Sequence, residues 1–94
     1  MIPEAGDIVL ADLGAEQRQL VLVLSSARFN RIAERAIVAP AAAQRPFPWR
    51  VAYDGQTFAV DLLKTVSTDV LLGVQARASQ DVTRRAQRAV RLVM

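Results

Sequence analysis

The side chains best suited to chemistry in this 94-residue chain are guanidinium groups, amides and hydroxyls. Arg18 stands in a short polar segment between two apolar stretches, residues 7–13 and 20–24. A guanidinium presents a planar fork of N–H donors, which binds a phosphate through two parallel hydrogen bonds. Because the pKa of free arginine lies above about 12, an electrostatic role suits Arg18 better than that of a base. Arg18 is therefore a candidate phosphate-binding cation.

Several other chemistries are excluded by composition. The chain contains no histidine and no cysteine, so a histidine-based ribonuclease mechanism, a Ser-His-Asp triad and thiol chemistry are ruled out. A zinc site would need four oxygen ligands, which that metal disfavours. The acidic residues are scattered and the four glycines lie far apart, so neither a magnesium site nor a Gly-rich phosphate loop is indicated. We expect no metal and no cofactor.

The charge balance is compatible with an anionic partner without requiring one. Eleven of the twelve cations are arginine, and residues 48–94 carry seven cations against four acids, which accounts for the net charge of +3. Such a balance is compatible with nucleic acid, although a solvated charged surface explains it equally simply. No apolar stretch approaches the roughly 18 residues of a membrane span, and no signal peptide is evident. We expect one domain over residues 1–94, in the cytoplasm and without membrane contact.

The apolar pattern predicts several short strands. Strands are expected at residues 7–13, 20–24 and 36–41, with the second buried on both faces. Two prolines make residues 44–48 a loop. Asp54 and Gly55 are typical of a hairpin turn between strands at 49–53 and 57–63, and further short strands are expected at 64–67 and 73–78.

Two helices complete the prediction. Ser25 or Ser26 caps a short one reaching about residue 33, with Phe29 and Ile32 expected to face inward. The second begins after Ser79, and its apolar side chains recur at helical spacing: Val82, Ala86, Ala89, Val90 and Val93. The fold class is therefore mainly β with α: a small, curved antiparallel sheet or half-open barrel with a short helix and a C-terminal helix.

Six short motifs occur in an order that resembles the MazF/PemK (Kid) family of toxin ribonucleases. Each is weak alone, but together they cover nearly the whole chain. They are the opening Gly6-Asp7-Ile8-Val9, the loop Gly14-Ala15-Glu16-Gln17, the serine-to-asparagine segment (Val21 to Ser25, then Phe29-Asn30), the strand end Val38-Ala39-Pro40, the aromatic and proline loop Pro46 to Val51, and Asp61-Leu62-Leu63-Lys64-Thr65-Val66.

The resemblance implies an SH3-like barrel that forms a homodimer. It further implies a growth-arresting toxin that cleaves single-stranded RNA at short sequences without metal, and a cognate antitoxin that wraps the dimer and blocks it. The family's catalytic pair is an arginine in the loop after the first strand and a threonine at the end of the third. Attack by a ribose 2′-OH builds negative charge at the phosphate, which a fixed guanidinium and an aimed hydroxyl stabilise.

The chain departs from the family pattern at the catalytic positions. Arg18 is the only arginine of its loop and stands one place from the family position, where Gln19 is found. The loop serine is replaced by Ala15, and the threonine by Ala42 with Ala43 beside it. Loss of one positioned donor typically lowers a rate by about a hundred-fold or more.

Matching residues to the family leaves one catalytic candidate, Arg18, and six RNA-binding candidates: Glu16, Gln17, Gln44, Arg45, Lys64 and Thr65. Phe47 and Trp49 are interpreted either as a platform for an unpaired base or as core or dimer contacts. Two alternatives to the ribonuclease stay open. One is the same fold as a catalytically weakened or dead module that binds RNA, antitoxin or both, and the other is a gyrase poison of the CcdB type.

Overall fold

The computed structural model describes residues 2–14 and 18–94. Within them the chain forms short strands, two α-helices and two single 3₁₀ turns, labelled η. In chain order these are β1 (Asp7–Asp12), β2 (Arg18–Val23), α1 (Ala27–Ala33), β3 (Arg35–Pro40), β4 (Arg50–Tyr53), β5 (Gln56–Ala59), η1 (Val60–Leu62), β6 (Lys64–Ser67), η2 (Thr68–Val70), β7 (Leu71–Arg77) and α2 (Gln80–Val93).

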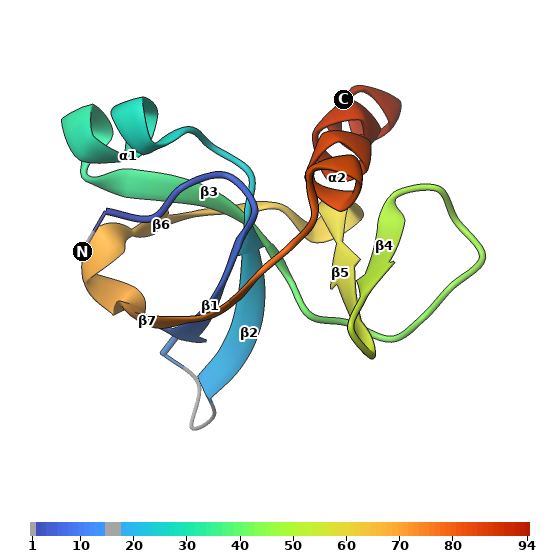
Figure 1. Cartoon of the computed structure of the whole chain (residues 1–94), viewed down its shortest axis with the longest axis horizontal. Helices are drawn as coiled ribbons and strands as arrows, with labels where there is room; N and C mark the ends of the chain where they lie inside the picture. Colours follow the sequence, from blue (N-terminus) through green and yellow to red (C-terminus); the bar gives the residue numbers. More distant parts are fainter. Residues whose placement is uncertain (1, 15–17) are drawn as a thin grey trace.

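Five of the strands form one antiparallel sheet in the order β6-β3-β2-β1-β7. The sheet curves strongly without closing, and the β4–β5 hairpin stands apart from it beneath α2 (Figure 1). The pairing of β1 with β7 shifts register twice, between Ile8 and Val9 and between Leu10 and Ala11. Such irregularities increase local twist. The predicted fold class, a curved antiparallel sheet with a short and a C-terminal helix, is confirmed.

Two apolar clusters use opposite faces of the curved sheet. Successive residues of a strand point to opposite faces, so Leu22 packs with the hairpin's Phe58 while its neighbour Val21 packs on the other side with Val38. Helix α2 adds its predicted apolar stripe to the first cluster, where Val82, Ala86 and Ala89 are buried. The core thus fixes both the sheet and the hairpin relative to α2.

Helix α1 corrects one prediction. Its N-cap is Ser26, whose Oγ accepts from the Phe29 N–H at 3.1 Å. The expected inward orientation of Phe29 and Ile32 is wrong, because these side chains are 41% and 74% exposed. The buried residue is Asn30. Two helical turns are too short for an apolar pattern to define a face, and the inward position is fixed by hydrogen bonds instead.

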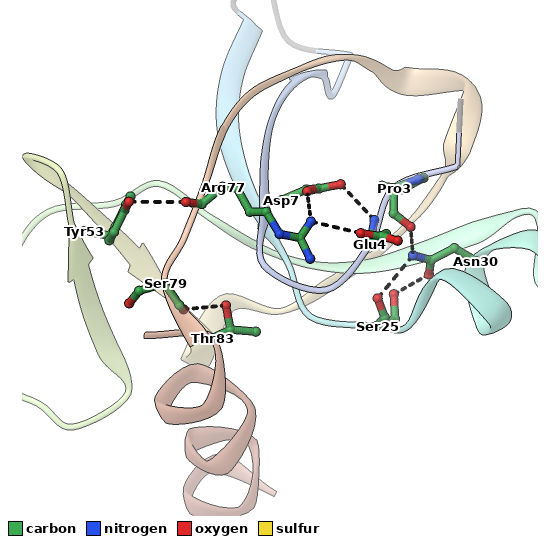
Figure 2. Close-up of polar contacts among 9 residues, drawn as sticks. All are labelled: Pro3, Glu4, Asp7, Ser25, Asn30, Tyr53, Arg77, Ser79 and Thr83. Atoms are coloured by element: carbon green, nitrogen blue, oxygen red, sulfur yellow. Dashed lines mark hydrogen bonds and ion pairs between the residues drawn. The ribbon is translucent and has the colours of Figure 1, made fainter. Parts of the chain in front are cut away.

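Asn30 ties the start of the chain to the β2–α1 connection (Figure 2). Its Nδ2 donates to the Pro3 carbonyl at 2.8 Å and to the Ser25 carbonyl at 3.2 Å, while its Oδ1 accepts from the Ser25 hydroxyl. That hydroxyl oxygen in turn accepts from the Ile37 N–H at 2.8 Å. The serine-to-asparagine motif of the sequence therefore has a structural role in this chain.

A second set of polar contacts joins β1 to β7. Arg77 Nη1 lies 2.7 Å from Asp7 Oδ1 and 3.0 Å from Glu4 Oε2 (Figure 2). The Tyr53 hydroxyl donates to the Arg77 carbonyl at 3.2 Å, which links the hairpin to the end of the sheet. These contacts connect β7 to the start of the chain and to the hairpin, and none of them involves a candidate site residue.

The strand predicted at residues 57–63 is also corrected. It ends at Ala59, and Val60–Leu62 forms the turn η1. The Val60 N–H donates to the Trp49 carbonyl at 2.9 Å, and Asp61 is held by Arg50. The chain must turn here because β5 belongs to the hairpin and β6 to the edge of the large sheet.

Candidate nucleic-acid interface

A cavity of about 580 Å³ opens where the β1–β2 connection approaches the β6 edge of the sheet. Its walls combine apolar side chains with Lys64 and two carboxylates; they are Asp12, Leu13, Gly14, Lys64, Val66, Ser67, Asp69, Val70 and Leu72. The edges of this concave surface carry both charge and hydroxyl groups. Asp12, Leu13 and Gly14 bring the described start of the β1–β2 connection into its wall.

Arg18 is the first residue of β2. It is exposed, and its partner across the β1–β2 ladder is Asp12, one of the cavity-lining residues. The RNA-binding candidates Glu16 and Gln17, like Ala15, lie outside the described residues. The structure therefore places one of the three polar loop candidates, the arginine.

The one-residue offset of Arg18 has a geometric consequence. Because side chains alternate along a strand, a shift by one residue moves a side chain to the other face. Arg18 shares its face with Leu20 and Leu22, whereas Gln19 shares the face of Val21. The guanidinium is thus carried by the face that looks toward the hairpin, at the end of the strand.

Residues 41–45 connect the large sheet to the hairpin. The Ala41 N–H donates to the Leu20 carbonyl at 3.0 Å, and the Ala42 N–H donates to the Thr57 carbonyl at 2.9 Å. Ala42, at the family's threonine position, therefore lies between β2 and β5. Because β2 and β3 are antiparallel, the last residues of β3 lie beside the first residues of β2. Arg18 and Ala42 therefore lie at the same end of this strand pair.

Gln44 and Arg45 are both exposed in this connection. The Gln44 Oε1 accepts from the Thr57 hydroxyl. Arg45 Nη1 donates to the Gln44 carbonyl at 2.9 Å, a contact with its own neighbour in the chain. Neither side chain is buried in the fold, so both retain donors that a ligand can use.

Sequence reasoning missed the pair that fixes this connection. Arg50 Nε and Nη2 donate to the two carboxylate oxygens of Asp61 at 2.8 and 3.0 Å, and Arg50 Nη1 donates to the Ala43 carbonyl at 2.7 Å. The hydrogen bond from Arg50 is the main cause that lowers the pKa of Asp61 from its ordinary value, and the same bond raises the pKa of Arg50. The signal was available, because Arg50 begins one hairpin strand and Asp61 follows the other.

The structure separates the last two candidates. Lys64 is exposed at the start of β6, pairs with Val38 and lines the cavity described above. Thr65, the next residue, pairs with Ile37 and lines a second cavity of about 510 Å³ on the other side of the sheet. Lys64 lies at the edge of both cavities. Lys64 and Thr65 therefore start on opposite faces of β6, whereas Gln44 and Arg45 lie in the connection between the large sheet and the hairpin.

Phe47 and Trp49 stack on each other with ring centroids 5.1 Å apart and an interplanar angle of 23°. Trp49 packs against the first apolar cluster, while Phe47 is 43% exposed. The pair belongs partly to the core and leaves one aromatic ring partly open. In residues 2–14 and 18–94, no three His, Cys, Asp or Glu side chains gather as a metal-binding group, and none of the helices there has the length and apolarity to cross a membrane.

Known structures share this fold. An endoribonuclease from a mycobacterial species superposes with a TM-score of 0.86 at 17% identity, over 99% of this chain and 91% of that one. The MazE–MazF complex of Deinococcus radiodurans, Form-III, gives 0.84 at 20% identity over 100% and 99% of the chains. A mycobacterial endoribonuclease in complex with its cognate antitoxin gives 0.84 at 16% identity over 97% and 93%.

A sequence comparison with curated proteins finds no match. A family model does match, over residues 4–94, and it describes the PemK-like, MazF-like toxins of type II toxin-antitoxin systems. That match covers the loop, the strand end and the hairpin described above. The chain belongs to the PemK-like, MazF-like toxin family of type II toxin-antitoxin systems.

Proposed function

We propose that this protein is an endoribonuclease that cleaves single-stranded RNA at short sequences without a metal ion. The observation that carries the proposal is membership of the toxin family over nearly the whole chain. Two structural neighbours are described as endoribonucleases. Two exposed cations would supply the charge that a phosphate substrate requires: Lys64 in the cavity wall, and Arg18 opposite the lining residue Asp12.

The reaction can be written without histidine and without a metal ion. The ribose 2′-oxygen attacks the adjacent phosphorus and loses its proton to water, and the bond from phosphorus to the 5′-oxygen breaks as that oxygen gains a proton from water. The products are a 2′,3′-cyclic phosphate and a 5′-hydroxyl end. Negative charge builds on the non-bridging oxygens during this step, and the guanidinium of Arg18 would stabilise it. The exposed donors of Gln44 and Arg45 suit hydrogen bonding to the edges of unpaired bases.

The proposal includes two protein partners. One is a cognate antitoxin, as in the complexes of the neighbours. The other is a second copy of this chain, since a 94-residue domain with exposed Leu72 and Val74 on its edge strand β7 gains stability by covering them. An RNA substrate and an antitoxin would place the protein in the cytoplasm. Light scattering of the purified protein measures the predicted homodimer directly.

The test is to incubate the purified protein with a mixed RNA in EDTA and to map the new ends. We expect cuts at a short recurring sequence, and cyclic phosphate ends. R18A should lower cleavage by about a hundred-fold or more, while R31A, which removes an exposed arginine of α1, should match the wild type. Absence of cleavage by the wild type would refute the proposal, and unchanged cleavage by R18A would refute the role of Arg18.

A second candidate is favoured by the alanines at 42 and 43, which remove hydroxyls from the family's catalytic position. In this version the protein binds RNA or antitoxin without cleaving. It predicts RNA retention in a filter-binding assay, with no new ends after prolonged incubation. A42T would then be expected to create cleavage where the wild type has none.

A further inference from the structure

The side chains of Ala42, Thr57 and Ala52 form a row across three neighbouring backbone segments. Ala41 bridges Phe58, and the Ala42 N–H donates to the Thr57 carbonyl at 2.9 Å, so Ala42 lies directly opposite Thr57. On its other side Thr57 pairs with Ala52 in the hairpin. Residues directly opposite in an antiparallel pair share a face, with Cβ atoms about 4.5–5.5 Å apart. The hydroxyl of Thr57 therefore lies about one strand spacing from the Ala42 methyl group.

This hydroxyl is open to a ligand. Ala41 and Phe58 pack into the first apolar cluster, and alternation directs Ala42 and Thr57 away from it. Thr57 and Ala42 are half-buried and Ala52 is exposed. The neighbours of the hydroxyl in the row carry only methyl groups, which leave space that larger side chains would fill.

The hydroxyl is also held in a defined position. Thr57 Oγ1 donates to the Oε1 of Gln44, which is exposed. A hydroxyl hydrogen rotates freely to a stronger acceptor, and a phosphate oxygen is such an acceptor because it is charged. Arg45 follows Gln44 in the chain and is exposed, so a cationic side chain is available beside the acceptor of this hydroxyl.

We infer that Thr57 donates its hydroxyl hydrogen bond to the substrate phosphate in place of the threonine that Ala42 replaces. The inference rests on the proposed ribonuclease function. The hydroxyl forms no covalent bond in this role. It contacts a non-bridging oxygen whose charge grows as the 2′-oxygen attacks, so its effect falls on the reaction step more than on binding.

The test compares variants that change one hydroxyl. T57V keeps the shape and β-branching of the side chain, and it should lower kcat about a hundred-fold with a few-fold change at most in the Kd for a 2′-O-methyl RNA. T57S, which keeps the hydroxyl, should remain within about ten-fold of the wild type. T68V removes a hydroxyl from η2, away from this row, and should leave cleavage unchanged.

A double variant sharpens the comparison. A42T/T57V returns the hydroxyl to the family position, and it should cleave at least ten-fold faster than T57V. Wild-type cleavage by T57V, or a double variant no faster than T57V, would overturn the inference while leaving the ribonuclease itself intact. A wild-type protein that cleaves no RNA would refute the proposed function and, with it, this inference.

Discussion

Replacing Asn30 by alanine should destabilise the protein severely. The side chain is fully buried and makes three hydrogen bonds, to the Pro3 carbonyl, the Ser25 carbonyl and the Ser25 hydroxyl. Each buried polar group left without a partner costs about 1–3 kcal/mol. Since Ser25 is half-buried and water can reach part of it, we expect about 3–5 kcal/mol in total, against a stability of about 5–15 kcal/mol for a domain of this kind.

Urea denaturation followed by circular dichroism measures this loss. At about 4–8 °C per kcal/mol, Tm should fall by at least about 12 °C. N30D should be similarly harmful, because it replaces the donor Nδ2 by an acceptor that faces two carbonyl oxygens. R28A, at an exposed position of the same helix, should stay within about 0.5 kcal/mol of the wild type. An N30A protein as stable as the wild type but unable to cleave RNA would refute the structural interpretation of this motif.

Three further predictions concern the Arg50–Asp61 ion pair, the positive φ of Gly6 and the position of Arg18. Arg50 lowers the pKa of Asp61 in the folded protein, so the stability from this ion pair is present above the unfolded pKa of about 3.9 and is lost as the pH falls through the lower folded value. The D61N variant should therefore have a lower Tm at pH 7 and a flatter fall of Tm below pH 4. Identical pH profiles of Tm for D61N and the wild type would contradict a stabilising role of the pair. Gly6 has φ +96°, and a Cβ there would lie 2.7 Å from Thr83 Oγ1, whereas Gly55 has φ +77° and open space around it. The G6A and G55A variants should both lose about 1–2 kcal/mol of stability through backbone strain. Thermal melts should show G6A to be the less stable of the two, and adding T83A to G6A should reduce the difference. Exchanging the loop residues as R18Q/Q19R preserves composition but moves the guanidinium to the other face of β2; RNA cleavage should fall to the level of R18A, and wild-type cleavage would show that the face does not matter.

The strands and α2 could be predicted from the sequence because their signals are local. The stripe of Val82, Ala86 and Ala89 defined a buried helix face, and Ser79 accepts from the Val82 N–H at 3.2 Å as a cap should. The predicted inward face of α1 was wrong, because the burial of Asn30 depends on a hydrogen bond to Pro3, which is 27 residues away in the chain. The spacing of apolar residues cannot predict such a contact.

The candidate site divides in the same way. A family pattern pointed to Arg18 and Lys64; the structure places Lys64 in a cavity wall and Arg18 opposite Asp12, another residue of that wall. The predicted hairpin offered a signal for the Arg50–Asp61 ion pair, which was missed. The position of Thr57 opposite Ala42 could not be predicted, because it depends on pairing between the hairpin and the segment that precedes it. The separation of Thr65 from Lys64 follows from strand alternation once β6 is paired with β3.

The most direct measurement of the central claim is a nuclear magnetic resonance titration of the protein with a single-stranded 2′-O-methyl oligonucleotide, which lacks the attacking hydroxyl. We predict that the largest changes in backbone amide chemical shift occur at five residues: Arg18, Gln44, Arg45, Thr57 and Lys64. Changes confined to the exposed arginines of α2, with the amides of those five residues unchanged, would contradict the proposed RNA-binding site.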